Sequence, residues 1–157
     1  MFAAYFFVAA MMWAAEPFSA LTVYDGGWTV TGAKTMAGPG KADALMNHCS
    51  RTEAYYACEQ VVNGKPMALM VFTATEDANK FHTQIVLPNG YSTGRGDLTL
   101  AGDHWTFLGK DVEGDKTTYF KTENIIKDHD HIHFDQFESA DGTTWVKKNE
   151  GDEVRTK

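Results

Sequence analysis

The sequence predicts an all-β protein that folds as an antiparallel up-and-down β-barrel of about eight to ten strands. The first observation is the regular spacing of turn residues, because Asn-Gly and Asp-Gly pairs tolerate the positive φ that tight hairpins require. The turn signals fall at Gly38-Pro39-Gly40, Asn63-Gly64, Pro88-Asn89-Gly90, Gly102-Asp103, Glu113-Gly114-Asp115, Asp141-Gly142 and Gly151-Asp152. The second observation is that the short connections favour a meander, which closes into a barrel more readily than it leaves long edges exposed.

The segments between the turns are rich in β-branched and aromatic residues and several of them alternate, as at Leu98 and Leu100. Such alternation gives each strand one apolar and one polar face. The expected strands are 26–32, 55–62, 66–74, 81–88, 97–102, 104–109, 117–125, 131–139 and 143–150. Phe137 breaks the alternation set by Phe134, which predicts a bulge near Asp135-Gln136. Residues 75–80 alone have helical character, over one or two turns at most.

The N-terminal segment is apolar from Phe2 to Ala15 and becomes polar at Glu16-Pro17. This run is shorter than the roughly 20 residues of a membrane-spanning helix and has the length of a secretory signal core. We interpret residues 1–15 as a signal peptide, which predicts a periplasmic or secreted protein with no stable membrane span after processing. A buried N-terminal helix is the alternative. Residues 16–157 then form a single β-barrel domain.

The formal net charge of the 157-residue chain is −7, and lysine and arginine do not occur in runs. The chain therefore offers no cluster of positive charge that could neutralise a phosphate backbone, so nucleic acid is not an expected partner.

The two cysteines, Cys49 and Cys58, are an even number in a chain that we expect to be exported. If the strands around them form a hairpin that turns near 52–55, the two residues face each other and can form a disulfide. Two buried free thiols are the alternative.

Gly26-Gly27-Trp28 has the G-x-W form that opens the first strand of lipocalins. The chain resembles the calycin-type barrels, and more closely a group of small exported bacterial proteins of unknown function with a lipocalin-like barrel. That closer resemblance rests on residues 54–72, on the glycines around Arg95, and on residues 137–155, and it extends over about 25–157. It implies that Trp28 closes one end of the barrel beneath a basic residue, for which Arg155 is the candidate. Both are then structural residues.

A barrel of this size is wide enough for packed side chains or for one small ligand. Large or adaptable apolar residues are candidates for contacting such a ligand: Met67, Met70, Phe72, Phe81, Trp105, Phe107 and Tyr119. A filled core requires the same residues, so both interpretations stay open.

Residues 128–135 place His129, His131 and His133 on one face of a strand. Neighbours in this row can share one Zn²⁺, and His104 is a candidate third ligand from another strand. The opposite face carries Ile132 and Phe134, which favour the barrel interior and so direct the histidines outward. The simpler interpretation is a polar outer face.

The sequence contains no phosphate loop, dinucleotide motif, nucleophile elbow or H-E-x-x-H motif. A strand carboxylate such as Glu59, Glu123 or Glu138 would act as an acid or base only if it pointed inward. We therefore expect a non-enzymatic binding protein for a small apolar molecule. The alternatives are a metal-binding protein, with zinc as the cofactor, and an enzyme that acts within the barrel.

Overall fold

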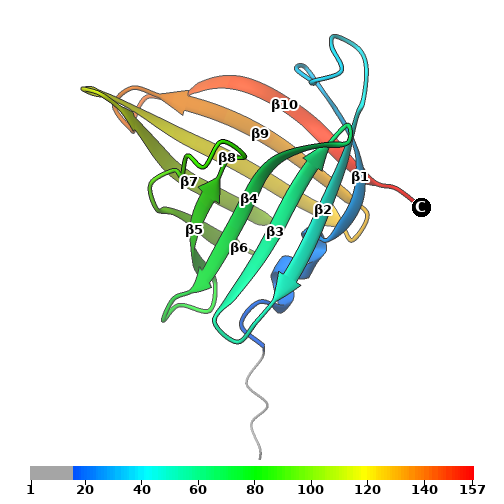
Figure 1. The fold of residues 1–157 in the computed structure, drawn as a ribbon, viewed down its shortest axis with the longest axis horizontal. Helices are drawn as coiled ribbons and strands as arrows, with labels where there is room; N and C mark the ends of the chain where they lie inside the picture. The colour runs from blue at the N-terminus through cyan, green and yellow to red at the C-terminus, as the bar shows by residue number, and fades with distance from the viewer. Residues whose placement is uncertain (1–15) are drawn as a thin grey trace, which may run out of the picture.

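The computed structural model describes residues 16–157, which form a closed antiparallel β-barrel. The predicted fold class is therefore confirmed, and the strand number is at the upper end of the predicted range (Figure 1). The predicted signal helix, residues 1–15, lies outside the described residues.

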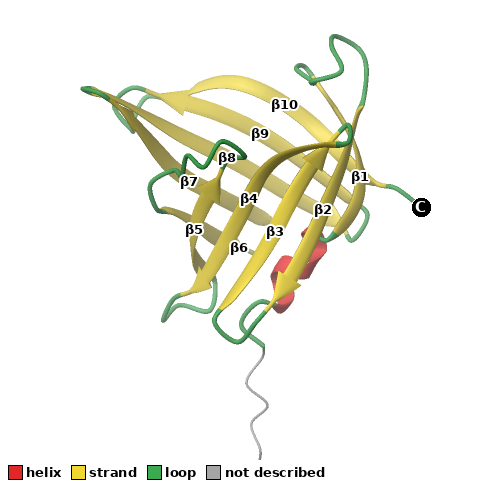
Figure 2. Ribbon diagram, viewed as in Figure 1, coloured by secondary structure: helices red, strands yellow, loops and turns green. Residues whose placement is uncertain are grey.

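One short 3-10 helix precedes the strands, and every strand pairs with its neighbours in the sequence (Figure 2). The elements are η1 (Ser19–Tyr24), β1 (Gly26–Gly32), β2 (Asp43–Arg51), β3 (Tyr55–Val62), β4 (Lys65–Ala74), β5 (Lys80–Val86), β6 (Gly96–Ala101), β7 (His104–Glu113), β8 (Lys116–Asp128), β9 (His131–Ser139) and β10 (Val146–Arg155). Among the described residues, no helix is long and apolar enough to cross a bilayer.

The barrel closes where β1 pairs with β10, in a register that runs from Trp28 opposite Arg155 to Gly32 opposite Gly151. The two backbones approach closely at Gly151, where an added Cβ would collide with the carbonyl oxygen of Thr31. A residue with a side chain cannot occupy this position without moving the strands apart.

The two ends of the barrel differ. At one end, η1 fills the interior with Phe18 and Leu21, which are 1% and 0% exposed and pack against Phe72, Phe81 and other strand residues. These buried side chains close this end of the barrel. The other end carries the β1–β2 connection and the loop between β5 and β6, and the long β7–β8 hairpin extends beyond its neighbours (Figure 1).

Two local predictions need correction, and one element was not predicted. Residues 75–80 form a turn and not a helix, because the Thr75 hydroxyl accepts the Asp77 N–H and donates to the carbonyls of Asp77 and Lys80. The helical turn lies instead in η1, which was not predicted. The expected bulge is on the facing strand β10, between Lys147 and Asn149, while β9 keeps its alternation through Phe137.

Candidate functional site

A cavity of about 460 Å³ occupies the barrel between the η1 end and the open end. Its wall is formed by residues from η1 and from all ten strands and two of the connections. The apolar part of the wall comprises Val30, Leu45, Val62, Met70, Phe72, Ile85, Phe107 and Phe134. This volume lies within the range of small-molecule sites, which is about 300–1,000 Å³.

The residues predicted to contact a ligand fall into three groups. Met70, Phe72 and Phe107 line the cavity. Phe81 and Trp105 belong to the buried core at the closed end, below the cavity. Met67 and Tyr119 are not part of the wall, and the Tyr119 ring lies beside Gly142 at the β9–β10 connection.

A group of four polar side chains lies at the inner end of the cavity, and we call it the polar floor: Tyr24, Asn47, Asn124 and Glu153. The Nδ2 of Asn124 donates to the Tyr24 hydroxyl at 3.0 Å, and the Nδ2 of Asn47 donates to the Tyr24 carbonyl at 2.9 Å. These bonds connect η1 to β2 and β8, and they leave the Oδ1 of Asn47 without a partner among residues 16–157.

Glu153 is the one carboxylate of the polar floor. Desolvation by burial raises its pKa to about 7. The pKa of Tyr24 is raised as well, chiefly by burial, with a smaller contribution from the negative charge of Glu153. The Tyr24 hydroxyl is therefore neutral at physiological pH, and it is close enough to Glu153 for the two groups to interact electrostatically.

Glu153 was not among the carboxylates that the sequence singled out. Lys121 and Lys148 pair with Glu123 and Glu138 away from the cavity, and Glu59 is exposed on β3. The alternation of β10 could have shown that Glu153 points inward. Arg155 was expected at a barrel end beside Trp28, and the residue two positions before it in a strand lies on the same face. Applied to β10, that rule places Glu153 inside.

The mouth of the cavity carries apolar and charged side chains together. Met36 and Phe120 line the cavity and are 55% and 42% exposed. Lys34 and Asp111 complete this rim, and the Tyr91 hydroxyl donates to Asp111 from the β5–β6 loop. The exposed apolar groups give the entrance an affinity for apolar surface.

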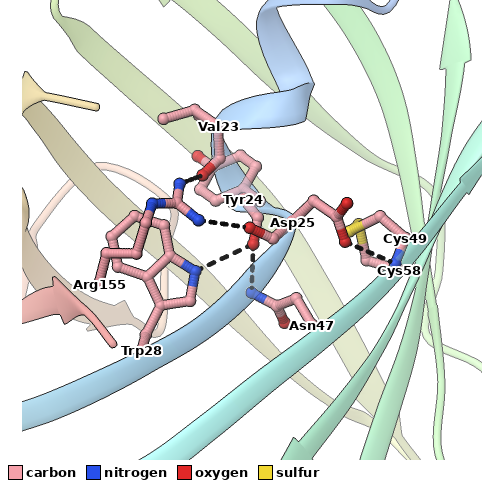
Figure 3. Close-up of a disulfide and its surroundings, with 8 residues drawn as sticks. All are labelled: Val23, Tyr24, Asp25, Trp28, Asn47, Cys49, Cys58 and Arg155. Carbon is pink, nitrogen blue, oxygen red and sulfur yellow. Dashed lines mark hydrogen bonds between the residues drawn. A yellow bond between two sulfur atoms is a disulfide. The ribbon is translucent and has the colours of Figure 1, made fainter. Parts of the chain in front are cut away.

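Arg155 closes the opposite end of the barrel against Trp28. The centre of the guanidinium lies 4.2 Å from the centre of the indole ring, and its nitrogens donate to the carbonyls of Val23 and Asp25 at 2.8 and 2.7 Å (Figure 3). Trp28 is fully buried and donates its own N–H to Tyr24 at 3.1 Å. These contacts fix η1, and with it the polar floor, at the end of the barrel.

The predicted disulfide between Cys49 and Cys58 is present, and the two residues face each other on β2 and β3 with Cα atoms 4.0 Å apart (Figure 3). Both cysteines pack in or against the core at the closed end, and Cys58 also lines the cavity. The disulfide therefore ties two strands of the cavity wall together.

The histidines lie outside the barrel, because the alternate residues Ile132 and Phe134 are buried. His131 and His133 each contact Oδ1 of Asp152, at 3.1 and 3.2 Å. Lys127 Nζ contacts the same oxygen at 3.0 Å. Although desolvation opposes it, hydrogen bonds from these three groups hold the pKa of Asp152 below its usual range.

The other candidate ligands do not join this cluster. His104 and His133 face Ile125 from its two sides in register, so they are two strand spacings apart, or about 9–10 Å. His129 lies at the β8–β9 turn, where its Nδ1 is 2.9 Å from Oδ1 of Asp130. Within residues 16–157, no group of three or more metal-ligating side chains is arranged to hold an ion.

No family model matches the chain, and no curated protein matches it in sequence. The fold is similar to that in the crystal structure of Rv2717c from M. tuberculosis, with a TM-score of 0.54 and 14% sequence identity. The alignment covers 91% of this chain and 99% of that chain. At this identity the likeness concerns the fold alone. Fold and cavity together define a closed antiparallel barrel of the kind that can enclose a small ligand.

Proposed function

We propose that the protein is an exported, non-enzymatic binding protein that holds a small, mostly apolar molecule in its barrel. The observation that carries the proposal is the cavity of about 460 Å³ with apolar walls and an apolar rim. Burying a ligand's apolar surface there is worth about 25 cal/mol per Å² before the costs of association. The polar floor would orient the molecule.

Binding is favoured over catalysis by the composition of the cavity wall. A group with a pKa of about 7, such as Glu153, can serve as a general acid or base. However, the wall formed by residues 16–157 includes no serine or histidine, and its one cysteine, Cys58, is in the disulfide. Glu153 therefore has no serine, histidine or free cysteine in the described wall to act with, which supports binding over catalysis.

The test uses Nile red, a neutral apolar dye that fluoresces strongly when it leaves water, and a variant that blocks the cavity. Gly109 lines the cavity, and a Cβ added there meets no atom within 4 Å. We expect Gly109→Trp to fold normally and fill the mouth, so that dye fluorescence is lost. Native mass spectrometry of freshly purified protein should also show a co-purified organic molecule in the unmodified chain only.

Thr99→Trp provides the matched control, because Thr99 is exposed on the outer face of β6. It adds the same indole outside the barrel and should leave dye binding unchanged. Equal fluorescence from Gly109→Trp and the unmodified protein would mean that the dye binds outside the cavity, which contradicts the proposal.

Export is supported by the apolar segment 1–15 and by the disulfide, since disulfides persist in oxidising compartments. The measurement is the mass of the mature protein recovered from the periplasm and the medium of its native host. We expect a chain that begins near residue 16. An unprocessed chain confined to the cytoplasm would contradict export without affecting the binding proposal.

A further inference from the structure

Glu153 lines the inner end of the cavity, and its carboxylate has no hydrogen-bond or ion-pair partner among residues 16–157. It points inward from β10, between the apolar side chains of Val30 on β1 and Ile132 on β9, which are its register neighbours. Desolvation is the one cause of its raised pKa, with no ion pair or hydrogen bond opposing it. The part of its surface that is not buried faces the cavity.

The neighbours of Glu153 in the polar floor are also hydrogen-bond acceptors. Asn47 is 3% exposed and lines the same cavity, and its Oδ1 is unpaired among residues 16–157. The Tyr24 hydroxyl already receives the N–H of Asn124. The inner end of the cavity thus presents a carboxylate and acceptor oxygens, while the amide groups of Asn47 and Asn124 each direct one N–H to Tyr24.

This environment determines which chemical group of a ligand can be bound favourably at the inner end of the cavity. A hydrocarbon tail placed here would leave the Glu153 carboxyl desolvated and unpaired, which costs free energy. A ligand carboxylate would place two like charges together. An ammonium group, in contrast, donates up to three hydrogen bonds and neutralises the carboxylate.

The charge of the whole chain favours the same choice, because a formal net charge of −7 attracts cations and repels anions at long range. Lys34, at the rim, is the local exception. A fatty acid could keep its carboxylate beside Lys34, but its tail would then lie against Glu153.

We propose, resting on the binding function above, that the ligand is an amphiphilic amine whose alkyl or aryl body fills the cavity and whose ammonium group pairs with Glu153. The Tyr24 hydroxyl oxygen, which is near enough to Glu153 for the carboxylate charge to raise the Tyr24 pKa, is a second acceptor for the ammonium group. Glu153 is thereby the residue that determines specificity.

The experiment compares three ligands of equal chain length, octylamine, octanol and octanoate, by isothermal titration calorimetry. We expect octylamine to bind about tenfold more tightly than octanol, and octanoate to bind more weakly than both. In Glu153→Gln, the amine should lose about tenfold in affinity and the alcohol should be unchanged. Glu123→Gln, which removes an outward carboxylate on β8, is the matched control and should change neither.

The outcomes separate this inference from the binding function. Equal affinities for amine and alcohol, or an amine affinity that Glu153→Gln leaves unchanged, would overturn the ammonium site. If Nile red enters the cavity and octanoate is the preferred ligand, binding stands and the inference fails. If neither the dye nor any of the three ligands binds, both proposals fail.

Discussion

The guanidinium of Arg155 stacks over the Trp28 ring and at the same time donates to backbone carbonyls from three places in the chain. Two of these, Val23 and Asp25, belong to or follow η1, and the third, His129, is in the β8–β9 turn, with bonds of 2.7–3.2 Å. This one side chain, at the end of β10, therefore links the helix that carries Tyr24 to the β8–β9 turn.

Replacing Arg155 with Met should lower the free energy of unfolding by about 2–4 kcal/mol, because it removes the cation–π contact and leaves carbonyls unpaired. Urea denaturation monitored by tryptophan fluorescence provides the measurement. Arg51→Met is the control, since Arg51 pairs with Glu16 on the surface and such pairs contribute about 0–1 kcal/mol. Equal losses in the two variants would contradict a special role for Arg155.

Removing the Cys49–Cys58 bond should also destabilise the barrel. The bond closes a short loop, since the cysteines are 9 residues apart in the sequence, and the chain-entropy model gives about 2–3 kcal/mol for a loop of this size. The double variant Cys49→Ala, Cys58→Ala should shift the urea midpoint downward. Reducing agent should lower the midpoint of the unmodified protein in the same direction and leave that of the double variant unchanged. A shift of the double variant with reductant would point to an effect unrelated to the disulfide.

Glu153 should make the ligand-free protein less stable as the pH rises. Its folded pKa is raised from 4.5 to about 7, so between these values the folded protein keeps a proton that the unfolded chain releases. Stability therefore falls through this window, by up to about 3 kcal/mol, and levels off above it. Inside the barrel, the Tyr24 hydroxyl keeps its proton in that window because its pKa is raised, and Arg155 on the same strand stays protonated. His131 and His133 lie on the outer face of the neighbouring strand β9, so the comparison with a variant that lacks only the carboxylate isolates the effect of Glu153.

Glu153→Gln is the variant that checks this prediction, with melting temperature measured from pH 5 to pH 8. The variant should melt above the unmodified protein at pH 8 and should lack the decrease that Glu153 causes between pH 5 and 7. Identical pH profiles for the two proteins would show that the carboxylate is solvated, which would also weaken the case for an ammonium site.

The sequence was sufficient for the architecture because each hairpin is a local unit with its own turn residues and alternation. The expected segments 26–32, 55–62 and 131–139 coincide with β1, β3 and β9. β2 was not among the expected strands, because its residues, Asp43–Arg51, mix polar and apolar types even though the turn residues Gly38-Pro39-Gly40 precede it. It could be inferred only as the hairpin partner of the Cys58 strand. Residues 75–80 were misjudged because the Thr75 and Asp77 side chains bond to the backbone as readily in a turn as in a helix.

The site was less predictable. A residue lines the cavity only if its side chain points inward and if it also lies at the level of the cavity along the barrel axis. Phe72 and Phe81 both point inward, yet Phe72 reaches the cavity and Phe81 packs below it against Phe18. The position of η1 decides that boundary, and η1 was not predicted. Glu153 could have been placed inside from the alternation that leads to Arg155.

The outer histidines provide the last prediction, which concerns zinc. His131 and His133 share Oδ1 of Asp152 with Lys127, whose ammonium group already occupies the position of a cation at 3.0 Å. The third candidate, His104, is two strand spacings away. We therefore expect Zn²⁺ to raise the melting temperature of the unmodified protein no more than that of His131→Ala. Lys127→Ala serves as the complementary variant, because removing the ammonium group opens the cluster to a metal ion. A zinc-dependent increase that disappears in His131→Ala while Lys127 is intact would show that the outer face binds metal in spite of this geometry.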